Sequence, residues 1–261
     1  MRLPGSGRPL ADGNRRVAYL ALLEFLARND IDSPEGTTYE RRLSGVAFAT
    51  VVAFLIRQNL GMADAAMGVR IVPANKASWD DLEAVLGGAN CHGGRCYCQR
   101  FKLGWNAWPG DDRERAHMLR EQTDCEHPRS ATTSGLIAYV GGEAAGWCNV
   151  EPRTAYPFLR SVPWRKRAED RTDASIWAVP CFITRAGFRR RGVSYALARF
   201  AVDFVRERGA RALEGYPMIP ERGKDVPWGE LHVGHVSIFA AAGFAEVSRP
   251  TLRRAVMRID F

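Results

Sequence analysis

The stretch "SIWAVPCFITRAGFRRRGVSYALARFAVDFVRERGARALEGYP" (residues 175–217) decides the fold of this chain of 261 residues. The apolar run over 175–184 is typical of a buried strand, and "RALEGYP" (211–217) predicts a second strand. Between them, apolar residues at helical spacing predict a helix with one core-facing side: Leu197, Phe200, Ala201, Phe204 and Val205. A strand, a crossover helix and a strand form a βαβ unit, so we expect the two strands to be parallel.

Pro180 is an unusual residue for the first of these strands. Proline has no backbone N–H and therefore removes one hydrogen bond from a strand ladder. We expect a bulge at this residue, or a place where the sheet splays open.

The turn "RAGFRRRGVS" (185–194) leads from the strand into the helix. A glycine-containing turn at this place exposes backbone N–H groups and the positive end of the helix dipole, and both suit a phosphate. Arg189 and Arg191 are expected to add charge-assisted hydrogen bonds, whereas Arg190 contributes little beyond its backbone N–H. Taken alone, the stretch fits a solvated basic turn capped by Ser194 equally well.

The sequence before this unit predicts a mixed series of strands and helices. Ser78 is a helix N-cap with Asp81 three residues later, and Gly141-Gly142 is typical of a tight hairpin turn. In chain order we predict a strand over 68–74, helices over 78–88 and 111–122, hairpin strands over 136–140 and 145–151, and a loop over 152–172.

Composition limits the class of protein without naming its function. The chain is 46% hydrophobic and has a formal charge of +8, which suits an anionic partner such as a phosphate ligand or a polynucleotide. It has six cysteines and no convincing signal peptide, so we expect a cytoplasmic protein without disulfides.

Two apolar runs mark the first part of the chain, over 17–28 and 45–56. Each predicts a helix too short to span a bilayer, which takes roughly 20 residues. We expect residues 1–66 to form a helical extension and residues 67–261 to form the main domain. A natural start at Met62 or Met67 is the alternative interpretation of the extension.

Motifs in the second half of the chain resemble those of the GNAT N-acetyltransferase superfamily. Arg189-x-x-Gly192-x-Ser194 resembles its R/Q-x-x-G-x-G/A signature, with Ser194 in place of the final Gly or Ala. "SIFAAAGF" (237–244) is similar to the last helix of that superfamily, and "RRAVMRIDF" (253–261) is similar to its last strand. With "CYCQRF", "GWCNVEPR" and "EGYP", these motifs resemble a bacterial subgroup of undefined substrate. The resemblance covers residues 69–261.

The resemblance implies an α/β fold with a mixed, twisted, partly splayed sheet that carries helices on both faces. It implies acetyl-CoA as co-substrate, bound where two parallel strands part. The backbone of Phe182, Ile183 and Thr184 would pair with the pantetheine arm and the acetyl carbonyl. The pyrophosphate would meet Arg189, Arg190, Arg191, Gly192, Val193 and Ser194.

Acetyl transfer to an amine sets two further requirements. Only about one part in a thousand of an alkyl amine is neutral at pH 7, so a base or a desolvated site must remove its proton. Glu214 is the base candidate, because the resemblance places it near the point where the strands part; a surface carboxylate or salt-bridge partner is the alternative interpretation. Backbone N–H groups near Ile183 are candidate donors to the oxyanion.

The leaving CoA thiolate must also be protonated or released as such. Many members of the superfamily carry a Tyr four residues before the Gly of the final Gly-Phe pair, but this chain has Phe239 there. Tyr216 and Ser237 are the candidate replacements. His232 and His235 are further candidates at helical spacing to Phe239, and a thiolate of pKa about 8.5 can also leave without a specific acid.

The cluster "CHGGRCYC" (91–98) raises the question of a metal. Zinc prefers thiolate and imidazole ligands, and Cys91, His92, Cys96 and Cys98 supply both kinds. The spacing does not present four ligands tetrahedrally, so we expect buried thiols and no metal.

Together these observations predict an acetyl-CoA-dependent N-acetyltransferase. It would move an acetyl group to a primary amine of a small molecule or a protein by direct attack in a ternary complex. The alternative is a non-catalytic GNAT-like protein that binds a nucleotide or nucleic acid, favoured by the positive charge and the missing Tyr. The expected partners are acetyl-CoA and an unidentified amine acceptor, with a homodimer as one option; a membrane is not expected, and nucleic acid is disfavoured.

Overall fold

The computed structural model describes residues 68–88, 90–91, 94–104, 107–108, 110–159, 162–163, 165, 167–220 and 228–261. The helices predicted over 17–28 and 45–56, the alternative starts at Met62 and Met67, and the boundary between residues 66 and 67 lie outside the described residues.

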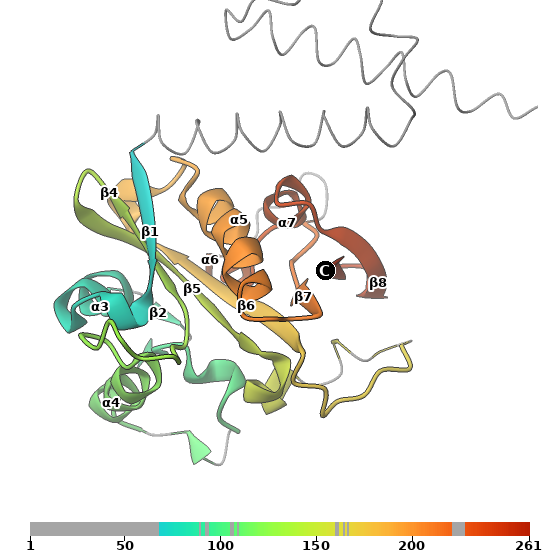
Figure 1. The fold of residues 1–261 in the computed structure, drawn as a ribbon, viewed down its shortest axis with the longest axis horizontal. Coiled ribbons are helices and arrows are strands. Elements are labelled where there is room, and N and C mark those ends of the chain that lie inside the picture. Colours follow the sequence, from blue (N-terminus) through green and yellow to red (C-terminus); the bar gives the residue numbers. More distant parts are fainter. Residues whose placement is uncertain are drawn as a thin grey trace, which may run out of the picture. The chain divides into compact units, whose positions relative to one another are not determined.

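A seven-stranded sheet forms the centre of the described residues, in the order β1-β4-β5-β6-β7-β9-β8 (Figure 1). Only β6 and β7 pair in parallel among these neighbours, and the other pairs are antiparallel. The strands are β1 (Val69–Pro73), β4 (Leu136–Val140), β5 (Glu143–Pro152), β6 (Ile176–Thr184), β7 (Ala212–Gly215), β8 (Ala245–Thr251) and β9 (Arg254–Asp260), and a separate ribbon pairs β2 (Asn90–Cys91) with β3 (Gly94–Arg95).

The helices begin where the sequence supplies caps or glycine turns. Ser78 accepts a hydrogen bond from the Asp81 N–H at the start of α3, and Asp111 accepts one from the Arg113 N–H at the start of α4. The α-helices are α3 (Trp79–Leu86), α4 (Asp112–Thr123), α5 (Val193–Arg206), α6 (Trp228–Leu231) and α7 (Val236–Ala241). Short 3-10 turns are η1 (Ala74–Lys76), η2 (Gln99–Phe101), η4 (Arg153–Ala155), η5 (Pro157–Leu159) and η6 (Ala186–Phe188).

The two faces of the sheet carry separate cores, because successive side chains of a strand point to opposite faces. In β4, Leu136 and Ala138 join the core that contains α5 and α7. Ile137 and Tyr139 of the same strand join the core that contains α3 and Leu119 of α4. The sheet therefore has helices on both faces, as the resemblance implied.

The predicted elements agree with the structure in kind and order. The predicted hairpin is present, with Gly141 and Gly142 both at positive φ, and the predicted loop over 152–172 contains two 3-10 turns. The elements that the sequence did not predict are β8, the ribbon of β2 and β3, helix α6, and the turns η1 and η2. The mixed, partly splayed α/β sheet of the fold prediction is confirmed.

Candidate active site

The parallel strands β6 and β7 separate in the middle of the sheet. Their register runs from Ile176 opposite Ala212 to Val179 opposite Gly215, where β7 ends while β6 continues to Thr184. We call this point of separation the fork. The register of β6 with β5 shifts at the same place, because Asn149 pairs with Cys181 and Glu151 pairs with Ala178. The bulge expected at Pro180 is therefore confirmed.

Residues 232–234 occupy part of the space that the fork opens. The Phe182 N–H donates to the His232 carbonyl oxygen at 2.6 Å, and the Met218 N–H donates to the Gly234 carbonyl oxygen at 2.9 Å. The Phe182 N–H was expected to pair with a pantetheine arm, but in this structure it is already bonded. Since N–H groups alternate sides along a strand, the Thr184 N–H points to the same side as that of Phe182 and the Ile183 N–H points toward β5. Of these two N–H groups, only that of Thr184 therefore points toward the fork.

The turn before α5 has the geometry of an anion site. Gly192 is the N-cap residue at φ +73°, Arg190 is at φ +61°, and no side chain caps the helix, so the Ser194 cap of the alternative interpretation is absent. The first intrahelical bond runs from the Ala196 N–H to the Gly192 carbonyl at 3.0 Å. The N–H groups of the first turn, in Val193 and Ser194, lie before this bond and are available to a ligand.

The three arginines of this turn are exposed. The Arg189 Nε donates to the Thr184 carbonyl at 3.4 Å, and the Arg191 guanidinium lies 5.5 Å from the centre of the Phe188 ring. The turn also lies tightly against β5, since a Cβ added to Gly146 would come within 2.5 Å of Val193. The backbone of the turn is thus fixed, while its charged side chains face solvent.

Glu214 lies at the fork with its side chain fully buried. Its carboxylate accepts hydrogen bonds from Arg153 at 3.1 Å, Arg167 at 2.7 Å and Arg258 at 3.0 Å. The Tyr216 hydroxyl donates to the same carboxylate at 2.9 Å. Four donors therefore surround the carboxylate, which has about four lone-pair positions.

A second carboxylate, Glu169, completes this group. It contacts Arg153 at 2.8 Å and Arg258 at 2.9 Å and also pairs with Arg167. Burial and the nearby Glu214 charge raise the pKa of Tyr216 well above its usual value. We call Arg153, Arg167, Glu169, Glu214, Tyr216 and Arg258 the Glu214 cluster. It joins the 152–172 loop to β7 and β9, and its geometry favours holding that loop over proton transfer by Glu214.

Phe239, which stands at the usual Tyr position of the superfamily, lies inside the fork and is fully buried. Its ring packs edge-on against Phe182 at 5.6 Å and Phe244 at 5.2 Å between centroids. A Cβ added to Gly215 would come within 1.9 Å of this ring, which explains the glycine at the end of β7. The ring thus rests directly on the backbone where the two strands part.

Ser237 belongs to a chain of hydrogen-bonding side chains at the start of α7. Its Oγ lies 2.7 Å from the Tyr195 hydroxyl oxygen and 2.7 Å from the His235 Nδ1. The Ser237 N–H donates to the same Nδ1 at 3.1 Å, so this nitrogen is an acceptor and the neutral ring carries its proton on Nε2. The prediction that His232 and His235 share a helical face with Phe239 is wrong, because α7 begins at Val236 and both histidines precede it.

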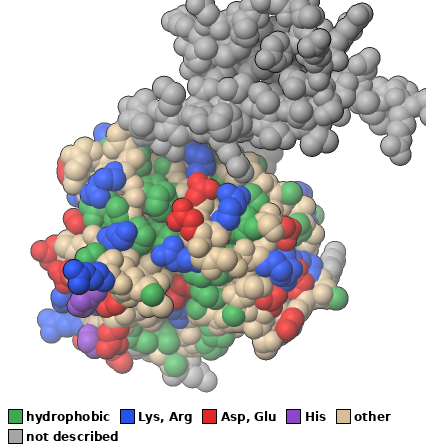
Figure 2. All heavy atoms as spheres, viewed as in Figure 1, with side chains coloured by type: hydrophobic (Ala, Val, Ile, Leu, Met, Phe, Trp, Pro, Cys, Tyr) green, Lys and Arg blue, Asp and Glu red, His purple; other side chains and the backbone are tan. Residues whose placement is uncertain are grey.

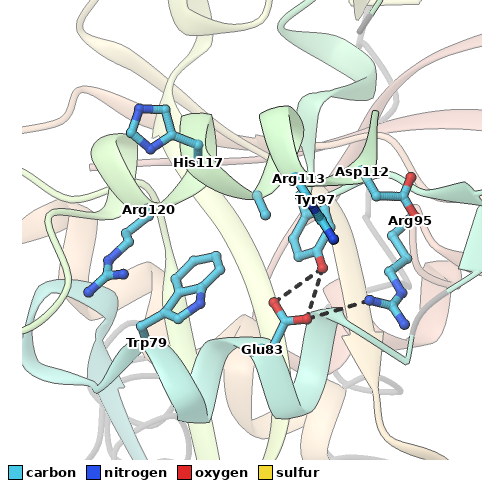
Figure 3. Close-up of a pocket in the computed structure, with 9 residues that line it drawn as sticks. Trp79, Glu83, Arg95, Tyr97, Asp112, Arg113, His117 and Arg120 are labelled. Carbon is cyan, nitrogen blue, oxygen red and sulfur yellow. Dashed lines mark hydrogen bonds and ion pairs between the residues drawn. The ribbon is translucent and has the colours of Figure 1, made fainter. Parts of the chain in front are cut away.

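A surface hollow of about 370 Å³ lies between α3 and α4 (Figure 3). Trp79 and Tyr97 form a stacked wall, and the Glu83 carboxylate accepts the Tyr97 hydroxyl at 2.9 Å. The remaining lining is Arg95, Asp112, Arg113, Ala116, His117 and Arg120. None of the sequence-predicted site residues lines this hollow.

The thiols of Cys96 and Cys98 are buried and free of disulfides. The Trp147 Nε1–H donates to the Cys98 Sγ at 3.0 Å. Within the described part of the chain, no group of three or more His, Cys, Asp and Glu side chains is arranged to hold a metal ion. His92 and the side chain of Cys91 lie outside it.

On the face of the molecule seen in Figure 2, Lys and Arg side chains alternate with Asp and Glu among apolar groups. Non-specific nucleic-acid binding depends on the neutralisation of many phosphates along a basic surface. The mixed charge of this face presents no continuous basic surface of that kind. The helices that the structure describes include none with the length and apolarity needed to cross a bilayer.

No protein-family model matches the chain, and no curated protein matches it. Among solved structures it is similar to a GCN5-related N-acetyltransferase from Kribbella flavida, at 16% identity over 74% of this chain and 98% of that chain, with a TM-score of 0.42. It is similar to the GNAT domain of S. lividans PAT, at 18% identity over 74% and 90% of the chains and a TM-score of 0.41. An N-acetyltransferase from Staphylococcus aureus Mu50 gives 11% identity, 74% and 98% coverage and a TM-score of 0.43.

The assignment of the fold rests on the chain's own topology. One parallel strand pair that forks, the crossover helix between its strands and the helices on both faces are the features that the resemblance implied. The chain has the GNAT fold.

Proposed function

We propose that the chain is an acetyl-CoA-dependent N-acetyltransferase that acetylates a primary amine by direct attack in a ternary complex. The observation that carries the proposal is the uncapped turn at Gly192, which offers helix N–H groups and exposed arginines next to a fork between parallel strands. This arrangement supplies a place for a pyrophosphate and, beside it, a place for the thioester arm.

The protein contributes little covalent chemistry to this reaction. The amine nitrogen attacks the thioester carbon, a C–N bond forms, the C–S bond breaks, the amine loses a proton and the CoA sulfur gains one. Holding amine and thioester in one orientation supplies a large part of the rate. The Thr184 N–H is the proposed donor to the oxyanion, and the Arg189–Ser194 turn is the proposed pyrophosphate site.

Glu214 remains the predicted base, but its contacts favour a second interpretation, in which it holds the 152–172 loop. The oxygens of this carboxylate already accept hydrogen bonds from three guanidinium groups and a hydroxyl, which leaves no evident lone pair directed at an amine. A Glu214→Gln variant separates the two roles. If Glu214 is the base, the acidic limb of the pH–rate profile disappears in a folded enzyme; if it holds the loop, the limb stays and the stability falls.

The proton for the leaving thiolate is proposed to come from Ser237 rather than Tyr216. Tyr216 is buried and donates to Glu214, whereas Ser237 is partly exposed and is hydrogen-bonded to Tyr195 and His235. Such a chain can replace the proton that Ser237 gives away. We expect Ser237→Ala to lower turnover without weakening acetyl-CoA binding, as measured by initial rates and calorimetry.

Titration calorimetry with acetyl-CoA and with S-acetylpantetheine tests the proposal as a whole. The second ligand keeps the thioester and lacks the pyrophosphate, so we expect micromolar binding of acetyl-CoA and binding of S-acetylpantetheine that is weaker by at least about a hundredfold. An acceptor screen that follows CoA release then tests turnover. Absence of acetyl-CoA binding at micromolar concentration contradicts the enzyme and favours the non-catalytic alternative.

A further inference from the structure

Two partly buried arginines border the fork, outside the Glu214 cluster and the Gly192 turn. Arg254, at the start of β9, donates from Nη1 to the Tyr216 carbonyl oxygen at 3.3 Å. Arg100 lies in η2, beside Phe101, whose ring stacks on His232 at 6.1 Å between centroids. The His232 carbonyl in turn accepts the Phe182 N–H, so both arginines border the segments that close the fork.

Both side chains border one apolar group: Phe101, next to Arg100 in the chain, packs against the cluster that contains Tyr216, and the Tyr216 carbonyl accepts a hydrogen bond from Arg254. The pKa of Arg254 is lowered first by burial and then by the Arg100 charge, with a smaller contribution from Arg253 and an opposing one from Glu230. Like charges that share a partly desolvated site cost free energy unless a counter-charge reaches them.

The described residues supply no dedicated counter-charge. The Glu230 carboxylate hydrogen-bonds Arg253 at 2.8 Å, and both of these side chains are largely exposed. The structure records no ion pair from Arg100 or Arg254 to a carboxylate of a described residue. The Nη1 of Arg100 is buried and has no hydrogen-bond partner among the described residues.

Such a pair resembles a ligand site more than a structural one. In the Glu214 cluster, each guanidinium meets at least one carboxylate, which is the usual state of a buried arginine. The N–H groups of a guanidinium lie in one plane and are spaced to donate to both oxygens of a carboxylate. Phe101 is the partly exposed member of the apolar group that also contains Tyr156, Ala178 and Tyr216, and its ring, beside Arg100, suits the carbon chain between a carboxylate and an amine.

We propose that Arg100 and Arg254 bind a carboxylate of the acceptor, so that the acceptor is an amino acid or a related amine that carries an acidic group. This inference rests on the proposed acetyl transfer, because it assigns the substrate class of that same site. His232 and Phe101 form the wall between the carboxylate and the fork.

Matched acceptor pairs test this assignment. β-Alanine and 4-aminobutanoate are compared with their amides by CoA release, and N-acetyl-β-alanine is compared with its amide by calorimetry, a measurement that needs no turnover. We expect the acid of each pair to be preferred by about tenfold or more, because charge-assisted hydrogen bonds to the carboxylate are absent for the amide. Arg100→Gln and Arg254→Gln should remove that preference.

Arg253→Gln is the matched control, since it removes the same charge from the neighbouring residue and leaves the pair intact. Arg254→Lys keeps the charge at the second position and covers the case in which Arg254→Gln does not fold. Equal turnover and equal binding of acid and amide overturn the proposal, and so does an equal loss in Arg253→Gln. The two hypotheses fail separately: acetyl-CoA that binds without an acid preference removes only the acceptor class, whereas arginine-dependent acid binding without acetyl-CoA binding removes only the acetyl transfer.

Discussion

The Gly192 turn and the Glu214 cluster are both rich in arginine, and both lie at the parallel strands β6 and β7, but their environments are opposite. In the turn, the arginine side chains are exposed and the first helical N–H groups have no side-chain cap. In the cluster, the three guanidinium groups are largely or fully buried and contact two carboxylates.

This difference separates arginines that can bind a ligand from arginines that hold the backbone in place. A guanidinium whose donors are already used by buried carboxylates fixes the backbone, and its loss leaves a charge without compensation. Donors that face solvent are lost with little effect on stability, and they remain available to a ligand. Arg100 and Arg254 differ from both groups: they are partly buried, and the structure records no ion pair from either of them to a carboxylate of a described residue.

The largest effect is expected from a substitution that breaks the Glu214 cluster. Glu214→Ala leaves three guanidinium groups facing a smaller set of acceptors, so we expect the free energy of unfolding to fall by about 3–5 kcal/mol, measured by denaturant titration. The control is Glu246→Ala, which removes an exposed pair with Arg249 and is expected to cost about 1 kcal/mol or less. Equal losses in the two variants contradict the holding role of the cluster.

Gly215→Ala tests the tight packing where the strands part. The added methyl group overlaps the Phe239 ring, so we expect a loss of about 1–3 kcal/mol in unfolding free energy. Phe239→Leu combined with Gly215→Ala should recover part of the loss in a double-mutant cycle. Gly88→Ala is the control, because its new Cβ has no atom within 4 Å. A loss no larger than that of the control contradicts the packing described at the fork.

Arg189→Ala tests the turn. We expect the affinity for acetyl-CoA to fall by about tenfold, because a charge-assisted hydrogen bond to phosphate is lost, and we expect only a small change in the unfolding midpoint, because the side chain is exposed. Arg190→Ala is the matched neighbour and should lose much less. Calorimetry measures both, and a wild-type affinity in Arg189→Ala removes this residue from the pyrophosphate site.

The smallest effect concerns Asp173, a partly exposed carboxylate that precedes β6. Hydrogen bonds from Ser175 and then Arg211 lower its pKa to about 2. A folded pKa below the unfolded value of about 3.9 stabilises the protein above pH 4, and this stabilisation is lost as the pH falls toward 2. The loss of unfolding free energy in Asp173→Asn relative to wild type should therefore be larger at pH 6 than at pH 2.5. A constant difference across both values contradicts the shift.

Much of the fold follows from local sequence patterns. The helical spacing from Leu197 to Val205 and the apolar run before it place α5 and β6 without knowledge of the rest of the chain. Pro180 indicates the bulge because a missing N–H is a local property. The last pair of strands is harder to predict from the sequence, since β8 is largely exposed and carries a weak apolar pattern.

The Glu214 cluster is what the sequence could not predict. Arg153, Arg167 and Arg258 come from a 3-10 turn, a loop and an edge-proximal strand, and no spacing rule joins them. Only the tertiary fold brings them to one carboxylate. The same holds for Tyr195 beside Ser237 and for Arg100 near Arg254, whereas the Gly192 turn was predictable because all its groups lie within a few consecutive residues.

The bulge at Pro180 also determines to which face of the sheet each later side chain of β6 points. Ala178 and Cys181 point to one face while Val179 and Phe182 point to the other, so the strand carries one extra residue between two correctly alternating halves. Deletion of that single residue would make the side chains of the second half of β6 exchange faces. Phe182 would leave the Phe239 side of the sheet, and Ile183 would take its place. One residue therefore decides which side chains, and which backbone N–H groups, a thioester would meet at the fork.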